Sequence, residues 1–255
     1  MLKLAVESDK ARIDAFCSKI PLGARISCNM AAYGLEFDFF NVWYGEDGGI
    51  LNSVVGSFCG VLTVCVADNA NYSEIADFLS MCNYSSLCAE KETLNKLSFP
   101  SGTDKRMFVY KGGSSAPTAE PCPQDLLKAA YSLIARSIPN AFAEDEQSYL
   151  AWLSDFTFRQ RRSLARIKAI CSDDTVLSCA LTAAESETAA IISGVACDAS
   201  TRGAGLGKKT VLSLANELLS EGKKVYVIAL NDGAGAFYEK IGFEPCGTVS
   251  YTEKE

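Results

Sequence analysis

The pattern of hydrophobic and polar positions divides the chain into two stretches that repeat one order of predicted elements. Each stretch begins with apolar residues at helical spacing and continues with apolar or alternating runs between turn residues. A helix, a strand, a short helix and a last strand follow in both. This shared order predicts a duplicated fold of mixed α+β class.

The first stretch predicts a helix that ends at Pro21-Leu22-Gly23, followed by short strands arranged as a meander. Gly56 and Gly60 are expected to break one long apolar run, and Ser73 is the expected N-cap of the next helix. The predicted helices cover 9–20, 73–81 and 90–96, and the predicted strands cover 25–30, 37–44, 50–67, 85–89 and 107–110.

The second stretch predicts an antiparallel meander of three strands between two pairs of helices. Acidic residues begin the helix over 144–160 and arginines end it, which complements the helix dipole. The predicted helices cover 126–137, 144–160, 205–219 and 233–240, and the predicted strands cover 164–171, 175–183, 188–197, 224–230 and 247–252.

A change of composition separates the two stretches. Residues 111–125, KGGSSAPTAEPCPQD, contain glycine, serine and three prolines, which disfavour helices and strands. We therefore expect a first domain over 1–115, a linker over 116–125 and a second domain over 126–255.

Composition excludes several kinds of chemistry. The chain of 255 residues is 48% hydrophobic and 22% charged, as expected for a globular protein with a sizeable core. It contains no histidine, which rules out histidine acid–base catalysis, Ser-His triads and most zinc sites. We expect no metal.

Charge, hydropathy and cysteine usage together predict a cytoplasmic protein without nucleic-acid or membrane partners. The net charge of −7 argues against binding to nucleic acids or anionic membranes. The most apolar stretch, 54–67, is too short to cross a bilayer, and the N-terminal sequence turns charged too early for a secretory signal. The eleven cysteines include no C-x-x-C pair and are typical of reduced, buried thiols.

The most informative segment is 189–207, AAIISGVACDASTRGAGLG, because it predicts a strand, a glycine-rich loop and the start of a helix in succession. The free N–H groups and the positive end of a helix dipole bind phosphate there, and glycine lets a ligand approach the backbone. The segment departs from the P-loop pattern at Arg202 and Lys209, and from the dinucleotide pattern at Lys208. What remains is R-x-x-G-x-G.

With its surroundings, this pattern resembles the coenzyme A site of the GNAT acyltransferase superfamily. The block FYEKIGF, after the next predicted strand, makes the resemblance specific, and it extends over about 164–252. The sequence departs from the family at Ala199, where relatives often carry proline. The residues that carry the resemblance are Val195, Ala196, Cys197, Arg202, Gly203, Ala204, Gly205, Leu206, Gly207, Lys208, Asn231 and Phe237 to Phe243.

The resemblance implies a twisted, mostly antiparallel sheet with a splayed parallel pair and flanking helices, in tandem if the first stretch is a degenerate copy. Strands 191–197 and 224–230 would splay, and backbone groups of Val195, Ala196 and Cys197 would pair with the pantetheine of acetyl-CoA. Backbone N–H groups from Gly203 to Lys208 would hold the pyrophosphate. Asn231 and Phe237 would contact pantetheine, and Tyr238 would protonate the departing thiolate.

The implied reaction is direct transfer of an acetyl group to a primary amine. A free amine of the lysine type has a pKa of about 10.4, so a base or a chain of waters must take its proton. Without histidine a carboxylate has to serve, and Asp198, Glu185 and Glu187 remain equal candidates. A backbone N–H near Cys197 would stabilise the oxyanion.

The partner expected from this reaction is a small-molecule or peptide amine. We expect the first domain to provide a wall of the acceptor cleft or a dimer surface, and a homodimer stays open. Two other functions share the glycine loop: a non-catalytic sensor of acyl-CoA, and transfer of a longer acyl group.

Several residues also have a purely structural interpretation. Tyr238 would then only pack on its helix, and Cys197 would be a core thiol and not an acyl carrier. Aromatic residues at helical spacing more often form core than a pocket, and arginines at a helix end are more often solvated than an anion site. These residues are Trp152, Phe156 and Phe158, and Arg159, Arg161, Arg162 and Arg166.

Overall fold

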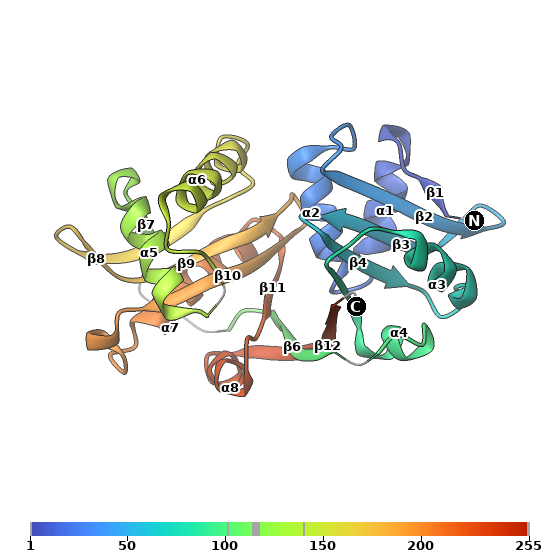
Figure 1. Cartoon of the computed structure of the whole chain (residues 1–255). Helices are drawn as coiled ribbons and strands as arrows, with labels where there is room; N and C mark the ends of the chain where they lie inside the picture. Colours follow the sequence, from blue (N-terminus) through green and yellow to red (C-terminus); the bar gives the residue numbers. More distant parts are fainter. Residues whose placement is uncertain (1, 101, 114–117, 140, 254–255) are drawn as a thin grey trace. The chain divides into compact units, whose positions relative to one another are not determined.

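The computed structural model describes residues 2–253 except 101, 114–117 and 140. By their contacts the residues form two compact units (Figure 1). The first comprises Met1–Phe108, Ala229–Gly235 and Pro245–Glu255, and the second comprises Val109–Ile228 and Ala236–Glu244. This division by contacts differs from the linear limits 1–115, 116–125 and 126–255, which stay a prediction about domains; residues 116 and 117 lie outside the described part.

The first stretch of the chain follows the predicted order except that a second helix precedes the meander. A 3₁₀ turn, η1, and two helices precede a β-meander, which is followed by a helix, a strand, a helix and a strand. The elements are β1 (Lys3–Leu4), η1 (Glu7–Asp9), α1 (Lys10–Cys17), α2 (Gly23–Tyr33), β2 (Phe40–Asp47), β3 (Ile50–Phe58), β4 (Val61–Val66), α3 (Tyr72–Met81), β5 (Ser86–Glu90), α4 (Lys91–Lys96) and β6 (Thr103–Tyr110).

The second stretch repeats that order: two helices, a meander, a helix, a strand, a helix and a strand. The elements are β7 (Glu120–Pro121), η2 (Gln124–Leu126), α5 (Leu127–Ser137), α6 (Glu146–Gln160), β8 (Ile167–Ser172), β9 (Thr175–Glu185), β10 (Ala189–Cys197), η3 (Ala199–Thr201), α7 (Leu206–Ser220), β11 (Lys224–Ile228), α8 (Asp232–Lys240) and β12 (Phe243–Glu253). The predicted duplication of the fold is therefore confirmed.

Both units contain a mixed sheet that includes a parallel pair of strands. In the first unit the strands follow the order β1-β2-β3-β4-β5-β12-β6, with β4 and β5 parallel. In the second the order is β11-β10-β9-β8-β7, with β10 and β11 parallel and the meander antiparallel. These sheets confirm the predicted fold class, a mostly antiparallel sheet with parallel pairs flanked by helices.

The last strand of the chain does not complete the sheet of its own repeat. Residues Val249–Glu253 of β12 pair antiparallel with Ser86–Glu90 of β5, within the first unit. Tyr251 accepts a hydrogen bond from Arg25 Nη1 at 3.2 Å, and Ser250 donates one to Asp104. The C-terminal strand of the second repeat is therefore a structural part of the first unit.

The predicted strand over 25–30 is wrong, because this segment belongs to helix α2. Ile26, Cys28 and Met30 alternate with polar residues, which gives the period of a strand. The same segment also has helical spacing, because four residues separate Ile26 from Met30 and three separate Met30 from Tyr33. All three side chains are buried in the structure. Two periods fit so short a run, and tertiary packing selects the helix.

Two local predictions about the meander region also need correction. The N-cap of α3 is Asn71, whose Oδ1 accepts from Glu74 N at 3.2 Å, and not Ser73. Gly56 lies inside β3, where a Cβ would come within 3.1 Å of Ile26 Cγ1, so glycine allows α2 to pack closely. Only Gly60, with positive φ, makes the predicted break.

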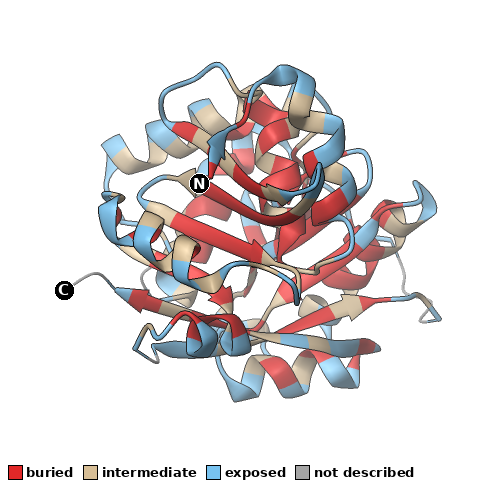
Figure 2. Cartoon of the chain, turned by 90° about the vertical axis from the view of Figure 1, so that its right-hand side faces the viewer, coloured by how far each residue is buried: buried red, intermediate tan, exposed pale blue. Residues whose placement is uncertain are grey.

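Each unit has its own hydrophobic core. Buried residues lie along the strands, and most loops are exposed (Figure 2). The core of the first gathers around β3, β4, β5 and α3, and that of the second around α5, β8 and β9. All eleven cysteines are free, and six are buried. Burial raises the pKa of the Cys17 thiol to about 12, so this thiol stays neutral and acts as a small apolar side chain.

Candidate functional site

The predicted splay of the parallel pair is present in the second unit. β10 pairs with β11 only from Ala189 to Ile192, although β10 continues to Cys197. Gly194, with φ of +56°, lies within a register shift between β10 and β9. A glycine inside an apolar strand is a signal for such a bulge, and the sequence analysis did not use it.

The departure of β11 leaves one edge of β10 open beside Val195, Ala196 and Cys197. Asp198 N donates to Leu177 O of the β9 segment at 2.8 Å. Because backbone groups point alternately to the two edges of a strand, the N–H of Cys197 points to the edge that β11 has left. This edge can pair with an extended ligand, as predicted for pantetheine, and offers a donor near Cys197 for an oxyanion.

The glycine loop and the start of α7 follow directly. Gly203 and Gly205 have φ of +87° and +78°, and a Cβ on either would meet no atom within 4 Å. Glycine is thus needed for backbone conformation and leaves open space above the loop. The residues Arg202, Gly203, Ala204, Gly205 and Lys208 are all exposed.

Helix α7 begins without a side-chain cap. Its N-cap is Gly205, no acidic residue lies in its first turn, and Lys209 N makes the first helical hydrogen bond, to Gly205 O at 3.1 Å. The N–H groups of Leu206, Gly207 and Lys208 therefore have no acceptor within the helix. Together with the helix dipole and Lys208, they form a site suited to a pyrophosphate.

Gly207 brings three elements of the second unit together. A Cβ at this position would lie 3.2 Å from Cys197 Sγ and 3.9 Å from Phe237 Cζ. The Cys197 thiol donates to Ser178 Oγ at 3.1 Å, and Ser178 Oγ lies 3.0 Å from Thr210 Oγ1 of α7. The end of β10, the first turn of α7 and the start of the FYEKIGF block therefore meet, as the motif pairing predicts.

Tyr238 lies on α8 and is 7% exposed. Its ring packs at 5.3 Å from that of Phe237 and at 5.6 Å from that of Phe243. Burial raises its pKa to about 12, because the phenolate would be poorly solvated there. The hydroxyl is therefore protonated at neutral pH, as a proton donor has to be.

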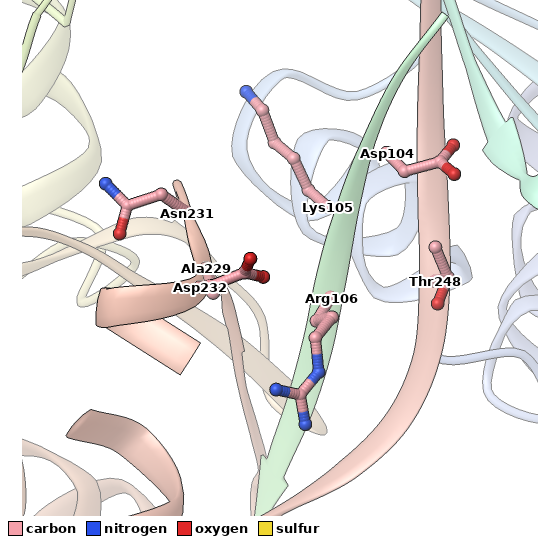
Figure 3. A pocket seen from close by; sticks show the side chains of 7 residues that line it. All are labelled: Asp104, Lys105, Arg106, Ala229, Asn231, Asp232 and Thr248. Atoms are coloured by element: carbon pink, nitrogen blue, oxygen red, sulfur yellow. The ribbon is translucent and has the colours of Figure 1, made fainter. Parts of the chain in front are cut away.

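Asn231 groups with the first unit. Its Oδ1 accepts from Ala234 N at 2.9 Å, which caps α8. Together with Asp232 from the same turn and with Lys105 and Arg106 from β6, it lines a pocket of about 140 Å³ (Figure 3). Acidic and basic side chains are mixed in this pocket, so it has no clear charge preference. A contact of Asn231 with pantetheine stays a prediction.

The structure separates the three carboxylates proposed as bases. Glu185 is wholly buried and is held by Arg166 and by Lys223 Nζ at 2.5 Å. Both carboxylate oxygens of Glu185 accept hydrogen bonds from these cations, so the structure does not favour Glu185 as the base. Asp198 accepts a hydrogen bond from Ser200 N at 3.0 Å and pairs with Arg136 at 3.3 Å. These contacts, the hydrogen bonds from Ser200 above all, lower the pKa of the Asp198 carboxyl. Glu187 is exposed in the β9–β10 turn.

Two of the arginines expected to be solvated are instead structural. Arg166 pairs with Glu185, Glu217 and Glu221, and lies at the centre of a network that Lys168 and Lys223 complete. The guanidinium of Arg159, on α6, is 9% exposed and pairs with Asp155 at 2.7 Å. The Asp155–Arg159 pair lies at helical spacing within α6. The partners of Arg166 come instead from β9 and from the end of α7, so local periodicity does not reveal them.

The predicted aromatic residues of α6 have three different environments. Phe156 is fully buried in the core, which confirms the structural interpretation. Phe158 lies under the Arg162 guanidinium, 3.7 Å from the ring centre. Trp152 packs against the core of the second unit and also lines a cavity there, and its place in an acceptor pocket stays a prediction.

The corresponding strand, loop and helix of the first unit lack the features of this site. β4 pairs with β3 without a register shift, and the loop that follows, Ala67 to Asn71, contains no glycine. At the start of α3, Asn71 caps the N–H of Glu74, and the Glu74 carboxylate adds a negative charge to the first turn. An anion would meet repulsion there, so of the two helix starts compared in the described residues only that of α7 is suited to a pyrophosphate.

Two general searches give negative findings for the described part of the chain. Among residues 2–253 with their gaps, no group of three or more histidine, cysteine or acidic side chains is placed to hold a metal ion. In the same residues, no helix has the length and apolar character needed to span a bilayer.

The open edge of β10 beside the uncapped start of α7 is suited to the pantetheine and pyrophosphate of an acyl-CoA. Comparison with known proteins agrees. Residues 127–243 match the model of the acetyltransferase (GNAT) family, and this segment is a GNAT acetyltransferase domain. Membership implies an N-acyltransferase that uses acyl-CoA. A search of curated proteins finds no significant match.

Solved structures extend the fold to the whole chain. A GNAT-family acetyltransferase from Colwellia psychrerythraea superposes with a TM-score of 0.63 at 14% identity, covering 100% of both chains. A tandem GNAT protein from the clavulanic acid biosynthesis pathway gives 0.61 at 12% identity, covering 99% of this chain and 98% of that one. A GCN5-related N-acetyltransferase from Sphaerobacter thermophilus gives 0.62 at 12%, covering 99% and 95%. At these identities the likeness shows a tandem GNAT fold alone.

Proposed function

We propose that the protein is an acetyl-CoA-dependent N-acetyltransferase that acetylates a primary amine by direct attack, with Tyr238 as general acid. The observation that carries the proposal is the open edge of β10 over Val195–Cys197, which leads into the uncapped start of α7. Pantetheine would lie along this edge, and the pyrophosphate would lie over Gly203 to Lys208.

Acetyl-CoA supplies the thioester carbonyl carbon, which the neutral amine attacks to form the new C–N bond. The N–H near Cys197 holds the oxyanion, and the C–S bond then breaks with its electron pair on sulfur. Tyr238 gives its proton to the thiolate, and the amine nitrogen loses one to water or to a carboxylate.

Replacement of Tyr238 by phenylalanine tests the acid role. We expect Tyr238→Phe to keep the affinity for acetyl-CoA within about threefold and to lower kcat by about 10² or more, the usual contribution of a general acid. The ring contacts with Phe237 and Phe243 do not need the hydroxyl, so the fold should persist.

The pH dependence of the rate, measured for the wild type and for Tyr238→Phe, tests the same role. With a pKa near 12, Tyr238 keeps its proton at every pH below that value and loses it only above. The wild-type rate should therefore rise with amine deprotonation and show no falling limb from Tyr238 between about pH 7 and pH 10. An unchanged kcat in Tyr238→Phe across this range would remove Tyr238 from the mechanism.

A further inference from the structure

The second unit contains a cavity that the coenzyme site does not use. Its volume is about 270 Å³, and α5, α6, β9, β10 and the segment after α5 form its walls. Apolar side chains line most of it, among them Ile134, Phe142, Trp152 and Leu181.

The aromatic side of the cavity is held rigidly. The Trp152 ring stacks on Phe156 of the core at 5.0 Å, with 13° between the planes, and lies 5.9 Å from the Phe142 ring. Phe142 in turn stacks on Tyr131 at 4.7 Å. A preformed aromatic wall binds another ring by offset or edge contacts, at little cost in conformational entropy.

The charge lining the cavity disfavours polycations. Among the described residues that line it, Arg159 alone is charged and none is a carboxylate. The Arg159 guanidinium is fixed by Asp155 through Nε at 3.0 Å and Nη2 at 2.7 Å, and by Ala183 O at 3.1 Å. A polyamine or an aminoglycoside would bring several ammonium groups to a wall without a counter-charge, which is costly.

The cavity reaches β10 where the strand loses its partner. Ser193 and Gly194 line it, and they lie between Ile192, the last residue paired with β11, and the open edge that begins at Val195. A cavity of about 150 Å³ holds one benzene molecule. The larger volume here accommodates a ring and a short alkyl chain that extends toward β10.

We infer that the acceptor is a primary amine on an aromatic or branched apolar body, with that body in this cavity and the amine at β10. The inference rests on the proposed acetyl transfer and names its substrate class. It narrows the choice left by the acidic net charge, which by itself also suits polyamines and aminoglycosides.

The test compares four amines with acetyl-CoA: 2-phenylethylamine, cyclohexylmethylamine, ethylamine and spermidine. We expect kcat/KM for the two bulky apolar amines to exceed that for ethylamine and for spermidine by at least tenfold. Calorimetry with 2-phenylethylamine on protein saturated with desulfo-CoA, which lacks the reactive thiol, measures occupancy of the cavity apart from turnover.

Trp152→Ala probes the wall, and Phe158→Ala is the matched control because Phe158 lies on the same helix outside the cavity. Trp152→Ala should raise the KM for 2-phenylethylamine at least tenfold while changing that for ethylamine less than twofold. A merely destabilised helix would affect both amines alike. The control should leave both KM values unchanged.

The outcomes separate the inference from the function on which it rests. A preference for spermidine, or no binding of 2-phenylethylamine to the desulfo-CoA complex, would overturn the inference while leaving acetyl transfer intact. Equal shifts of both KM values in Trp152→Ala would overturn it as well. Failure to bind acetyl-CoA at all would instead remove the proposed function.

Discussion

Gly205→Asp is expected to weaken acetyl-CoA binding about a hundredfold, whereas Gly205→Asn should weaken it only a few-fold. Gly205 has φ of +78°, and asparagine and aspartate both tolerate this conformation better than other side chains. The two variants therefore match in shape and in backbone strain, and differ in one negative charge beside the predicted pyrophosphate.

The magnitude follows from Coulomb's law. A carboxylate about 5 Å from one phosphate charge, at an effective dielectric constant of about 20, is repelled by about 3 kcal/mol, which is about a hundredfold in Kd. Calorimetric titration of both variants measures the difference, and raised salt should reduce it. Equal affinities for the two variants would show that no phosphate lies at this loop.

Removal of residues 245–255 is expected to unfold the first unit, although these residues follow the second GNAT repeat in the sequence. Val249–Glu253 provide the antiparallel partner of β5, and Val249 and Ser250 are each only 1% exposed. Their loss would leave the backbone groups of β5 that face β12 without partners, since β4 pairs only with the other edge, and would open the core beside them.

Hydrogen exchange resolves this effect by unit. In the shortened chain, amides of β3, β4 and β5 should exchange much faster, while those of β8, β9 and β10 should be affected less. A chain that ends at Glu253 keeps β12 and is the matched control. Retained protection of β5 after removal of 245–255 would show that β12 is dispensable for the first unit.

Local periodicity was sufficient for most of the fold because most elements have one dominant period. The two meanders and the parallel pair of β10 and β11 follow from apolar runs between turn residues and from a helical crossover. It failed at α2, where Ile26, Cys28 and Met30 fit two periods. Periodicity could not reveal that β12 pairs with β5, because the sequence of a strand does not determine which strand it pairs with.

In the candidate site too, some features could be predicted from the sequence and others could not. The glycine loop, the uncapped start of α7 and the contact of Cys197, Gly207 and Phe237 concern neighbouring elements, and the motif carries them. The burial of Glu185 between two cations and the wall formed by Trp152 depend on packing between distant elements. Such packing leaves no local signal in the chain.

The most direct test of the account is a calorimetric titration of acetyl-CoA into the wild-type protein. We expect one molecule per chain, because α7 offers free N–H groups and basic residues, whereas α3 is capped by Asn71 and carries Glu74 in its first turn. Binding at one site, weakened about a hundredfold in Gly205→Asp, would support the proposed acetyl-CoA site. No binding, or two equal sites per chain, would contradict it.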